Sequence, residues 1–302
     1  MRTRSLAVET ERYPRSLSRN SLAAVSLAAA AFLFGATFVV VKDAVTVLPP
    51  LGFVGWRFLI GALVLLAVAR PRTRAALTAG VIAGLWLFAG YAFQTKGLVT
   101  TSASNSGLVT GLYVVLTPLL AAAVRRHRPS PLVLGGAVVA FYGLAVLTMS
   151  NGFQLQTGDA WTLGAAVAFA GHIVYLSRVA HLHPVVAMTG VQLAVTAVLG
   201  LAASAVFEDF MIPGSASVVP LLVTGIAISA GAFLLQMWSQ TILGPSRTAL
   251  ILALEPAFAA LTGAVVLEER LGLRGWLGAG LILAGIYVVL TSTGAEDELI
   301  GS

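Results

Sequence analysis

Cysteine is absent from this 302-residue chain, and charged residues make up only 10% of it. Without cysteine there is no disulfide scaffold, no thiolate zinc site, no cysteine-ligated iron–sulfur centre and no cysteine nucleophile. A soluble domain carries about 25% charged residues, so the shortage of charge excludes an ordinary soluble protein. In its place the chain has 58% hydrophobic residues and a mean hydropathy of +0.93. Lipid is therefore the solvent for most of this chain.

Ten apolar stretches are long enough to cross a membrane. A bilayer core about 30 Å thick needs roughly 17–25 apolar residues in a helix, because no water is present there to satisfy the backbone. The loops are short, which leaves no room for a domain outside the membrane. We therefore predict an all-α integral membrane protein with ten transmembrane helices, at residues 21–41, 51–69, 75–94, 102–124, 132–149, 160–179, 184–206, 217–238, 246–267 and 275–292.

Lys and Arg are distributed unevenly between alternate loops. With a cytoplasmic N-terminus, thirteen of the 18 basic residues fall on the inner side and four on the outer side, while Arg57 lies within the second span. Because cytoplasmic loops carry such an excess, we predict a multi-pass protein of the cell membrane with both termini cytoplasmic. Topology thus explains the net charge of +6, and no nucleic-acid partner is expected. The inner residues are Arg2, Arg4, Arg12, Arg15, Arg19, Arg70, Arg72, Arg74, Arg125, Arg126, Arg128, Arg178 and Arg247.

The two halves of the chain align with each other at an offset of roughly 140 residues. Each half holds five spans, and because five is odd the second half enters the membrane from the opposite side. We predict an inverted repeat of residues 21–149 and 160–292, with tails at 1–20 and 293–302, which is the arrangement of many secondary transporters. The aligned pairs include Pro49 with Pro184, Arg57 with Gln192, Gln94 with Gln236, and Thr117-Pro118 with Glu255-Pro256.

Five short patterns occur in order along residues 21–292. They are Phe34-Gly35-Ala36-Thr37-Phe38-Val39 with Lys42; Arg57-Phe58 after Pro49-Pro50; Tyr91-Ala92-Phe93-Gln94 followed by Thr101-Ser102-Ala103-Ser104-Asn105; Leu254-Glu255-Pro256; and Leu267-Glu268-Glu269-Arg270-Leu271. Together they resemble the drug/metabolite transporter superfamily, in its ten-helix members with two EamA-type domains. The resemblance implies a small-solute carrier whose central cavity is lined mainly by spans 1, 3, 4, 6, 8 and 9. It does not name the solute, because the family includes carriers of amino acids, nucleosides, amines and drugs in both directions.

Ionisable groups inside the membrane are costly, and by default they mark functional sites. Arg57, lying near the outer end of its span, either snorkels to the surface or has a functional role. His172 either donates to a neighbouring helix or takes part in solute or proton binding. Glu255 lies nine residues into its span, next to the helix-kinking Pro256. It is expected to bind a proton, to bind a cationic solute, or to complete a kinked helix.

Several of the spans that the resemblance places around the cavity also carry uncharged polar residues on one helix face, since a helix turns by 100° per residue. Such residues either line a cavity or join helices through hydrogen bonds worth about 0.6 kcal/mol each. The stripe on the eighth span contains Ser229, Phe233, Gln236 and Gln240. The predicted solute-binding residues are Glu255, Gln94, Gln236, Tyr113, Tyr91, Asn105, His172, Tyr175 and Arg57, with Glu255 and His172 as candidates for proton coupling.

The chain has no GxSxG, HExxH or P-loop lysine motif, which argues against an intramembrane enzyme and against an ATP-driven pump. No cofactor or metal site is expected. Gly136 with Gly143, and Gly278 with Gly285, suit close helix packing or the seam of a homodimer. We predict a secondary transporter, an exporter or facilitator of small amphipathic or zwitterionic solutes such as amino acids, amines or drugs. The alternatives are a channel-like or scaffold membrane protein, and an intramembrane enzyme.

Overall fold

The computed structural model describes residues 18–44, 48–101, 103–149, 156–266 and 272–291, and no strand occurs within them. The all-α prediction is therefore confirmed for this part of the chain. The two tails, except residues 18–20, and the pattern at 267–271 lie outside the described residues. The helices are α1 (Arg19–Ala44), α2 (Pro50–Val68), α3 (Arg74–Leu98), α4 (Ala103–Gly111), α5 (Tyr113–Arg125), α6 (Pro131–Thr148), α7 (Asp159–Val179), α8 (Val185–Phe207), α9 (Ser215–Val223), α10 (Phe233–Gln240), α11 (Pro245–Leu252), α12 (Glu255–Val266) and α13 (Leu273–Thr291), with a 3-10 turn at Ala180–Leu182 and a π-helical segment at Thr224–Ala232.

Nine helical runs in the described residues are long and apolar enough to cross a membrane. The predicted span at 246–267 is not among them, because it is divided between α11, with 8 residues, and α12, with 12. Neither is long enough to cross alone. End to end they cover residues 245–266. The chain is therefore an all-α membrane protein with about ten crossings, and the crossing at residues 245–266 is broken.

A second break divides the predicted fourth span, where α4 gives way to α5 at Leu112. Pro256 explains the break before α12, because it has no N–H to donate to the carbonyl of Leu252 and its ring crowds that carbonyl. In the repeat register that pairs Gln94 with Gln236, the first residue of α5, Tyr113, corresponds to the first residue of α12, Glu255. The helix boundaries thus favour pairing Glu255 with Tyr113 over the pairing with Thr117 read from the sequence.

Helices α6 and α13 pack backbone to backbone on glycines. A Cβ added to Gly143 would lie 2.7 Å from the carbonyl oxygen of Gly278, and one added to Gly285 would lie 2.5 Å from that of Gly136. Such close approach is what small residues permit in membrane helices. These four glycines are buried between two helices of one chain, so they are not free to form the homodimer seam considered from the sequence.

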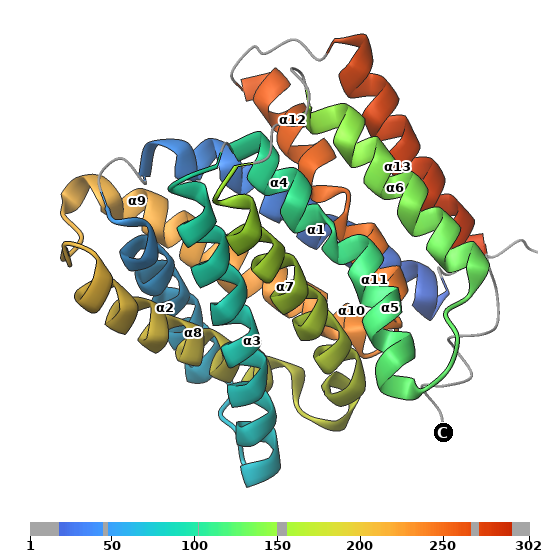
Figure 1. Cartoon of the computed structure of the whole chain (residues 1–302). Coiled ribbons are helices and arrows are strands. Elements are labelled where there is room, and N and C mark those ends of the chain that lie inside the picture. Colours follow the sequence, from blue (N-terminus) through green and yellow to red (C-terminus); the bar gives the residue numbers. More distant parts are fainter. Residues whose placement is uncertain (1–17, 45–47, 102, 150–155, 267–271, 292–302) are drawn as a thin grey trace, which may run out of the picture.

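The helices form three groups in Figure 1. At one side lie α2, α8 and α9, at the other lie α6, α12 and α13, and between them run α1, α3, α5 and α7. The middle group brings together segments from both halves of the chain. The cavity described below lies among these central helices.

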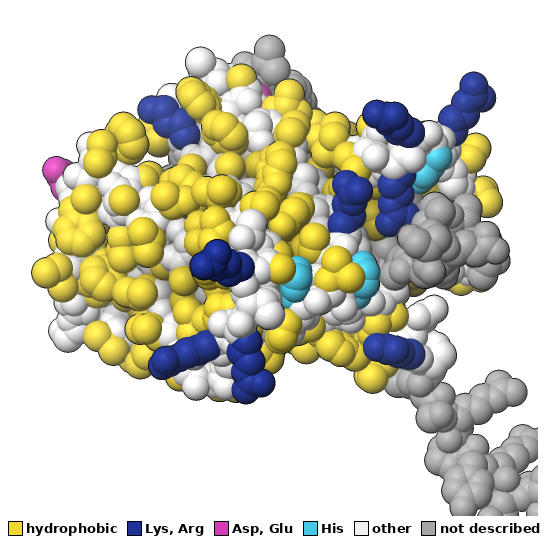
Figure 2. Space-filling view, turned by 90° about the horizontal axis from the view of Figure 1, so that it is seen from below, with side chains coloured by type: hydrophobic (Ala, Val, Ile, Leu, Met, Phe, Trp, Pro, Cys, Tyr) yellow, Lys and Arg dark blue, Asp and Glu magenta, His cyan; other side chains and the backbone are white. Residues whose placement is uncertain are grey.

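The loops that join α2 to α3, α5 to α6 and α7 to α8 lie at one end of the bundle, because successive spans run in alternate directions. Figure 2 views that end and shows basic side chains at several places on it, with His between them. The arginines of these loops are Arg70, Arg72, Arg126 and Arg128, with Arg74 at the start of α3 and Arg125 and Arg178 in the last turns of α5 and α7.

Candidate functional site

A cavity of about 110 Å³ lies between the central helices. Its walls come from α1, α3, α4, α5, α7, α10, α11 and α12. In the numbering of predicted spans these are spans 1, 3, 4, 6, 8 and 9, the set that the family resemblance implies. The polar lining residues are Tyr91, Gln94, Thr110, Tyr113, His172, Gln236 and Glu255, and the apolar ones are Phe34, Leu87, Phe169, Ile173, Phe233 and Leu252.

Six of the nine predicted solute-binding residues line this cavity, namely Tyr91, Gln94, Tyr113, His172, Gln236 and Glu255. Arg57 lies behind the wall, next to Tyr91. Tyr175 packs instead on a separate cluster that includes Ala79 and Met188. Asn105 is in α4, but its side chain lies outside the described residues. Location alone does not assign a role, so the roles of all nine remain predictions.

Glu255 provides the carboxylate of the cavity lining, at the first residue of α12. It lies within electrostatic range of Arg57, Tyr91 and Tyr113. Helix α1 approaches this turn closely, because a Cβ added to Gly35 would lie 2.6 Å from the carbonyl oxygen of Glu255. The glycine of the first sequence pattern therefore lets α1 contact the start of α12.

Arg57 is only 6% exposed, so it points into the bundle rather than snorkelling to the surface. Its Nη2 donates a hydrogen bond to the Tyr91 hydroxyl at 3.1 Å. The guanidinium carbon also lies 4.9 Å from the ring centroid of Phe58 and 5.3 Å from that of Tyr91, within cation–π distance. Arg57 thus holds Tyr91 in the wall. Within the described residues its buried Nε has no hydrogen-bond partner.

His172 makes the interhelical contact that was one of its two predicted alternatives. Its Nε2 lies 3.0 Å from the Gln192 side-chain oxygen, and both side chains are buried. In this geometry the ring N–H donates to the amide oxygen, joining α7 to α8. Gln192 is the residue that aligns with Arg57 in the internal repeat. His172 also lines the cavity, so a role in solute binding remains a prediction.

The two aligned glutamines, Gln94 and Gln236, lie in the wall of the same cavity. Gln94 donates to the hydroxyl of Thr110 at 3.4 Å and so connects α3 to α4. Gln236 donates to the Gln240 oxygen at 3.3 Å, one turn along α10. Gln240 in turn donates to the carbonyl of Ile173 at 2.9 Å and so fixes α10 to α7. Gln240 is therefore a helix-joining residue.

The wall is completed by the aromatic rings of Phe34, Tyr91, Phe169 and Phe233, and Tyr91 is the one of these four that was predicted to bind solute. Phe34 and Phe233 pack edge to face with centroids 5.0 Å apart, and Tyr91 and Phe169 do so at 5.5 Å. The internal repeat contained a signal for one of these rings, because Tyr91 aligns with Phe233. Such faces suit the apolar part of a solute or a cation.

The cavity is smaller than the roughly 300–1,000 Å³ typical of small-molecule sites, so a solute larger than a few atoms requires the central helices to move apart. The lining offers one carboxylate, amides, hydroxyls and aromatic faces. Among the described residues no group of three His, Asp or Glu side chains is placed to hold a metal ion. Such a lining is suited to reversible binding.

Comparisons with known proteins agree with this arrangement. The sequence model of the EamA-like transporter family matches residues 21–149 and 156–291. The chain is 33% identical over 266 residues to an "Uncharacterized transporter" of Archaeoglobus fulgidus, over 88% of this chain and 84% of that protein. It is 27% identical over 276 residues to a "Probable amino-acid metabolite efflux pump" of Escherichia coli K12, over 85% and 90%. A solved crystal structure has the same fold, with a TM-score of 0.74 and 22% identity over 88% of this chain and 96% of that one.

Proposed function

Because the chain belongs to the EamA-like transporter family of the drug/metabolite transporter superfamily, we propose that it is a secondary transporter that exports small amphipathic or zwitterionic solutes by alternating access. Membership of this family makes it a membrane transporter and not an enzyme. The direction of transport, the solute class and the mechanism are the proposal.

One observation carries the proposal: Glu255 lies at a helix break in the wall of a cavity that both halves of the chain surround. Transporter sites are commonly built where a discontinuous helix and a charged group meet near the bilayer midplane. Within the described residues no hydrogen bond is made to the Glu255 carboxylate. It is therefore available to a solute or a proton.

Alternating access is supported by contacts that recur under the internal repeat. In the alignment that pairs Gln94 with Gln236, Gly136 is equivalent to Gly278 and Gly143 to Gly285. The contact of Gly136 with Gly285 is therefore equivalent to the contact of Gly278 with Gly143, and both contacts are present. In the alignment that pairs Arg57 with Gln192, the contact of Gly55 with Gly200 is likewise equivalent to the contact of Gly190 with Leu65, and both are present. Contacts that map onto each other in this way are expected of two inverted halves. If the halves exchange conformations, the cavity opens to the opposite side of the membrane.

The solute class follows from the lining. The Glu255 carboxylate suits an ammonium group, the amides of Gln94 and Gln236 suit polar atoms, and the rings of Phe34 and Phe233 suit apolar carbon. Amines and amino acids combine these features. The name of the Escherichia coli relative, an amino-acid metabolite efflux pump, supports the same solute class and the export direction.

Counterflow in proteoliposomes tests the proposal. Vesicles loaded with unlabelled amino acid or amine should transiently accumulate the labelled solute, because a carrier exchanges one molecule for another. A channel would only equilibrate the label, and a scaffold protein would leave it outside. Either of the last two results, across a panel of amino acids, amines and cationic dyes, would reject the carrier.

Both termini are proposed to be cytoplasmic, because the basic loops at one end match the inner side of the bilayer. A C-terminal green fluorescent protein fusion should therefore fluoresce, and a C-terminal alkaline phosphatase fusion should be inactive. An active phosphatase fusion with no fluorescence would mean that the protein has the opposite orientation in the membrane. The description of the cavity would not change.

Proton coupling is assigned to Glu255 rather than to His172, whose ring already bonds Gln192. In vesicles containing a trapped pH indicator, addition of solute should change the internal pH. A Glu255→Gln variant should remove that change, whereas His172→Gln should retain it. An unchanged internal pH in the wild type during measurable counterflow would mean that transport is uncoupled.

A further inference from the structure

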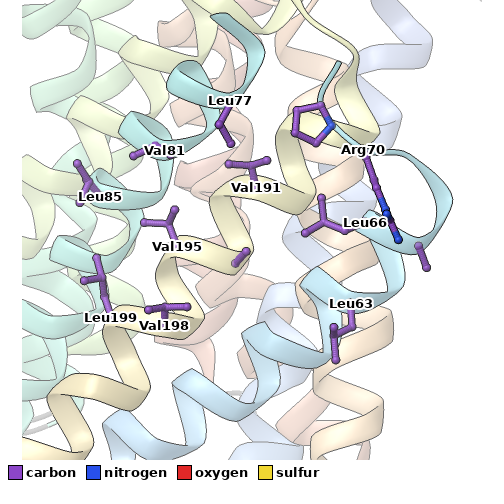
Figure 3. A pocket seen from close by; sticks show the side chains of 13 residues that line it. Leu63, Leu66, Arg70, Leu77, Val81, Leu85, Val191, Val195, Val198 and Leu199 are labelled. Carbon is purple, nitrogen blue, oxygen red and sulfur yellow. The ribbon is translucent and has the colours of Figure 1, made fainter. Parts of the chain in front are cut away.

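A second hollow lies on the side of the bundle, away from the cavity. It is a groove of about 880 Å³ between α2 and α3, with α8 as its floor. Figure 3 shows Leu77, Val81 and Leu85 on one wall, Leu63 and Leu66 on the other, and Val191, Val195 and Val198 between them. Apart from Arg70, the lining side chains are all apolar. The volume is within the range of ligand-binding pockets.

The groove is a fixed feature of the packing. A Cβ added to Gly80 or to Gly84 would lie 2.6 Å from Val191 or Val195, so α3 and α8 are in close contact. On the other side α8 meets α2 at Gly190, where an added Cβ would lie 2.9 Å from Leu66. Because α8 is held tightly by both neighbours, the outward side chains of α2 and α3 form walls that cannot close on each other.

The depth of the groove matches one leaflet of the bilayer. Its floor runs from Val191 to Leu199, which at 1.5 Å per residue is about 12 Å. Half of a hydrocarbon core about 30 Å thick is about 15 Å. At one end the groove is bounded by Arg70 and Pro71, in the short loop between α2 and α3. A helix from a second copy would cross both leaflets, whereas a lipid tail occupies only one.

The charge at the loop end selects the headgroup. Arg70 is exposed and is the charged residue of the lining, Arg72 follows it on the same loop, and Arg74 begins α3. The described residues place no carboxylate in an ion pair with Arg70. A guanidinium matches the geometry of a phosphate group.

We propose that this groove binds one phospholipid, with an acyl chain along α8 and the headgroup phosphate at Arg70, and that anionic phospholipids are preferred. The site is distinct from the solute cavity, so the proposal stands or falls independently of the proposed transport activity.

Native mass spectrometry of the full-length protein tests the site. The delipidated protein is mixed with equal amounts of dioleoyl phosphatidylglycerol and dioleoyl phosphatidylcholine. We expect a one-lipid adduct in which phosphatidylglycerol is favoured about fivefold, as expected for one basic residue near an anionic membrane surface. Arg70→Gln should remove the preference. Arg72→Gln, on the same loop but outside the lining, should keep it and serves as the matched control.

A second pair of variants tests the apolar part of the groove. Val198 is 63% exposed and lines the groove, while Val219 of α9 is 67% exposed and does not. Val198→Trp should fill the groove and lower the adducts of both lipids, whereas Val219→Trp should leave them unchanged. Leu63→Trp, at a residue 62% exposed on the α2 wall, should repeat the effect of Val198→Trp.

Three results would overturn the proposal. The first is equal binding of the two lipids by the wild type and by Arg70→Gln. The second is an unchanged lipid adduct in both Val198→Trp and Leu63→Trp. The third is a dimer of the wild type that Val198→Trp converts to a monomer while the lipid adduct stays the same, which would make the groove an interface between two copies of this chain.

Discussion

The two broken spans have matching backbones and different chemistry. Helix α5 begins at Tyr113 and α12 begins at Glu255, its counterpart in the repeat, and both side chains line the cavity. One break therefore presents a neutral phenol and the other a carboxylate. The second break is also contacted by the backbone of α1 at Gly35.

The buried charges show the same asymmetry. Arg57 in the first half aligns with the neutral Gln192, and Glu255 in the second half aligns with the neutral Tyr113. At the cavity, each half thus contributes one of these two charges, and neither charge is repeated at the aligned position of the other half. The two halves therefore share the helical frame around the cavity and differ in the charged side chains that they place beside it.

Replacing the carboxylate should have the largest effect. Glu255→Gln keeps the size of the side chain but removes its charge, and losing one partner of a buried charged contact costs about 2–5 kcal/mol, which lowers the transport rate about 30-fold or more. The measurement is the initial rate of counterflow at equal protein incorporation. Tyr113→Phe, at the corresponding break, should stay within about threefold, since it removes one neutral hydrogen bond. Wild-type rates for Glu255→Gln from pH 6 to 8 would show that the charge has no role.

The next effect concerns the contact between Gly35 of α1 and the second break. Gly35→Ala would place a Cβ 2.6 Å from the carbonyl of Glu255 and 2.8 Å from the nitrogen of Ala259. Such overpacking should lower the free energy of unfolding by about 1–3 kcal/mol. At Gly107 in α4 an added Cβ meets nothing within 4 Å, so Gly107→Ala should be neutral or stabilising by up to about 1 kcal/mol. Thermal unfolding in detergent compares the two, and equal melting temperatures would contradict the close approach of α1 to α12.

The smallest expected effect is a difference in stability between variants of the two aligned glutamines. Gln94 joins α3 to α4 through Thr110, whereas Gln236 bonds within α10. Gln94→Leu should therefore cost about 0.6 kcal/mol of stability, the average worth of an interhelical hydrogen bond in a membrane. Gln236→Leu should cost less, because Gln240 keeps its bond to Ile173. If Gln236→Leu were the more destabilising variant in thermal unfolding, the assignment of these two bonds would be wrong.

The eighth span divides its predicted polar stripe between the two alternatives, and its uniform helical spacing was wrong. Its stripe of Ser229, Phe233, Gln236 and Gln240 assumes 100° per residue, but residues 224–232 form a π-helical segment. Phe233 and Gln236 line the cavity as a result of their place in α10, Gln240 binds α7 instead, and Ser229 packs beside Gly61. A π-helical turn changes the angle between residues, and no local sequence signal marked it.

Hydropathy and the needs of a lipid-embedded backbone were enough to locate the spans, because every N–H and C=O in the bilayer core must be bonded within a helix. The cost of a proline inside a helix likewise marked the break at Pro256. Those properties are local, so the sequence alone determined them. The inward burial of Arg57, the aromatic rings around the cavity and the groove at α8 depend on which neighbour each helix meets. An almost uniformly apolar helix does not specify that face by itself, so only tertiary packing decided it.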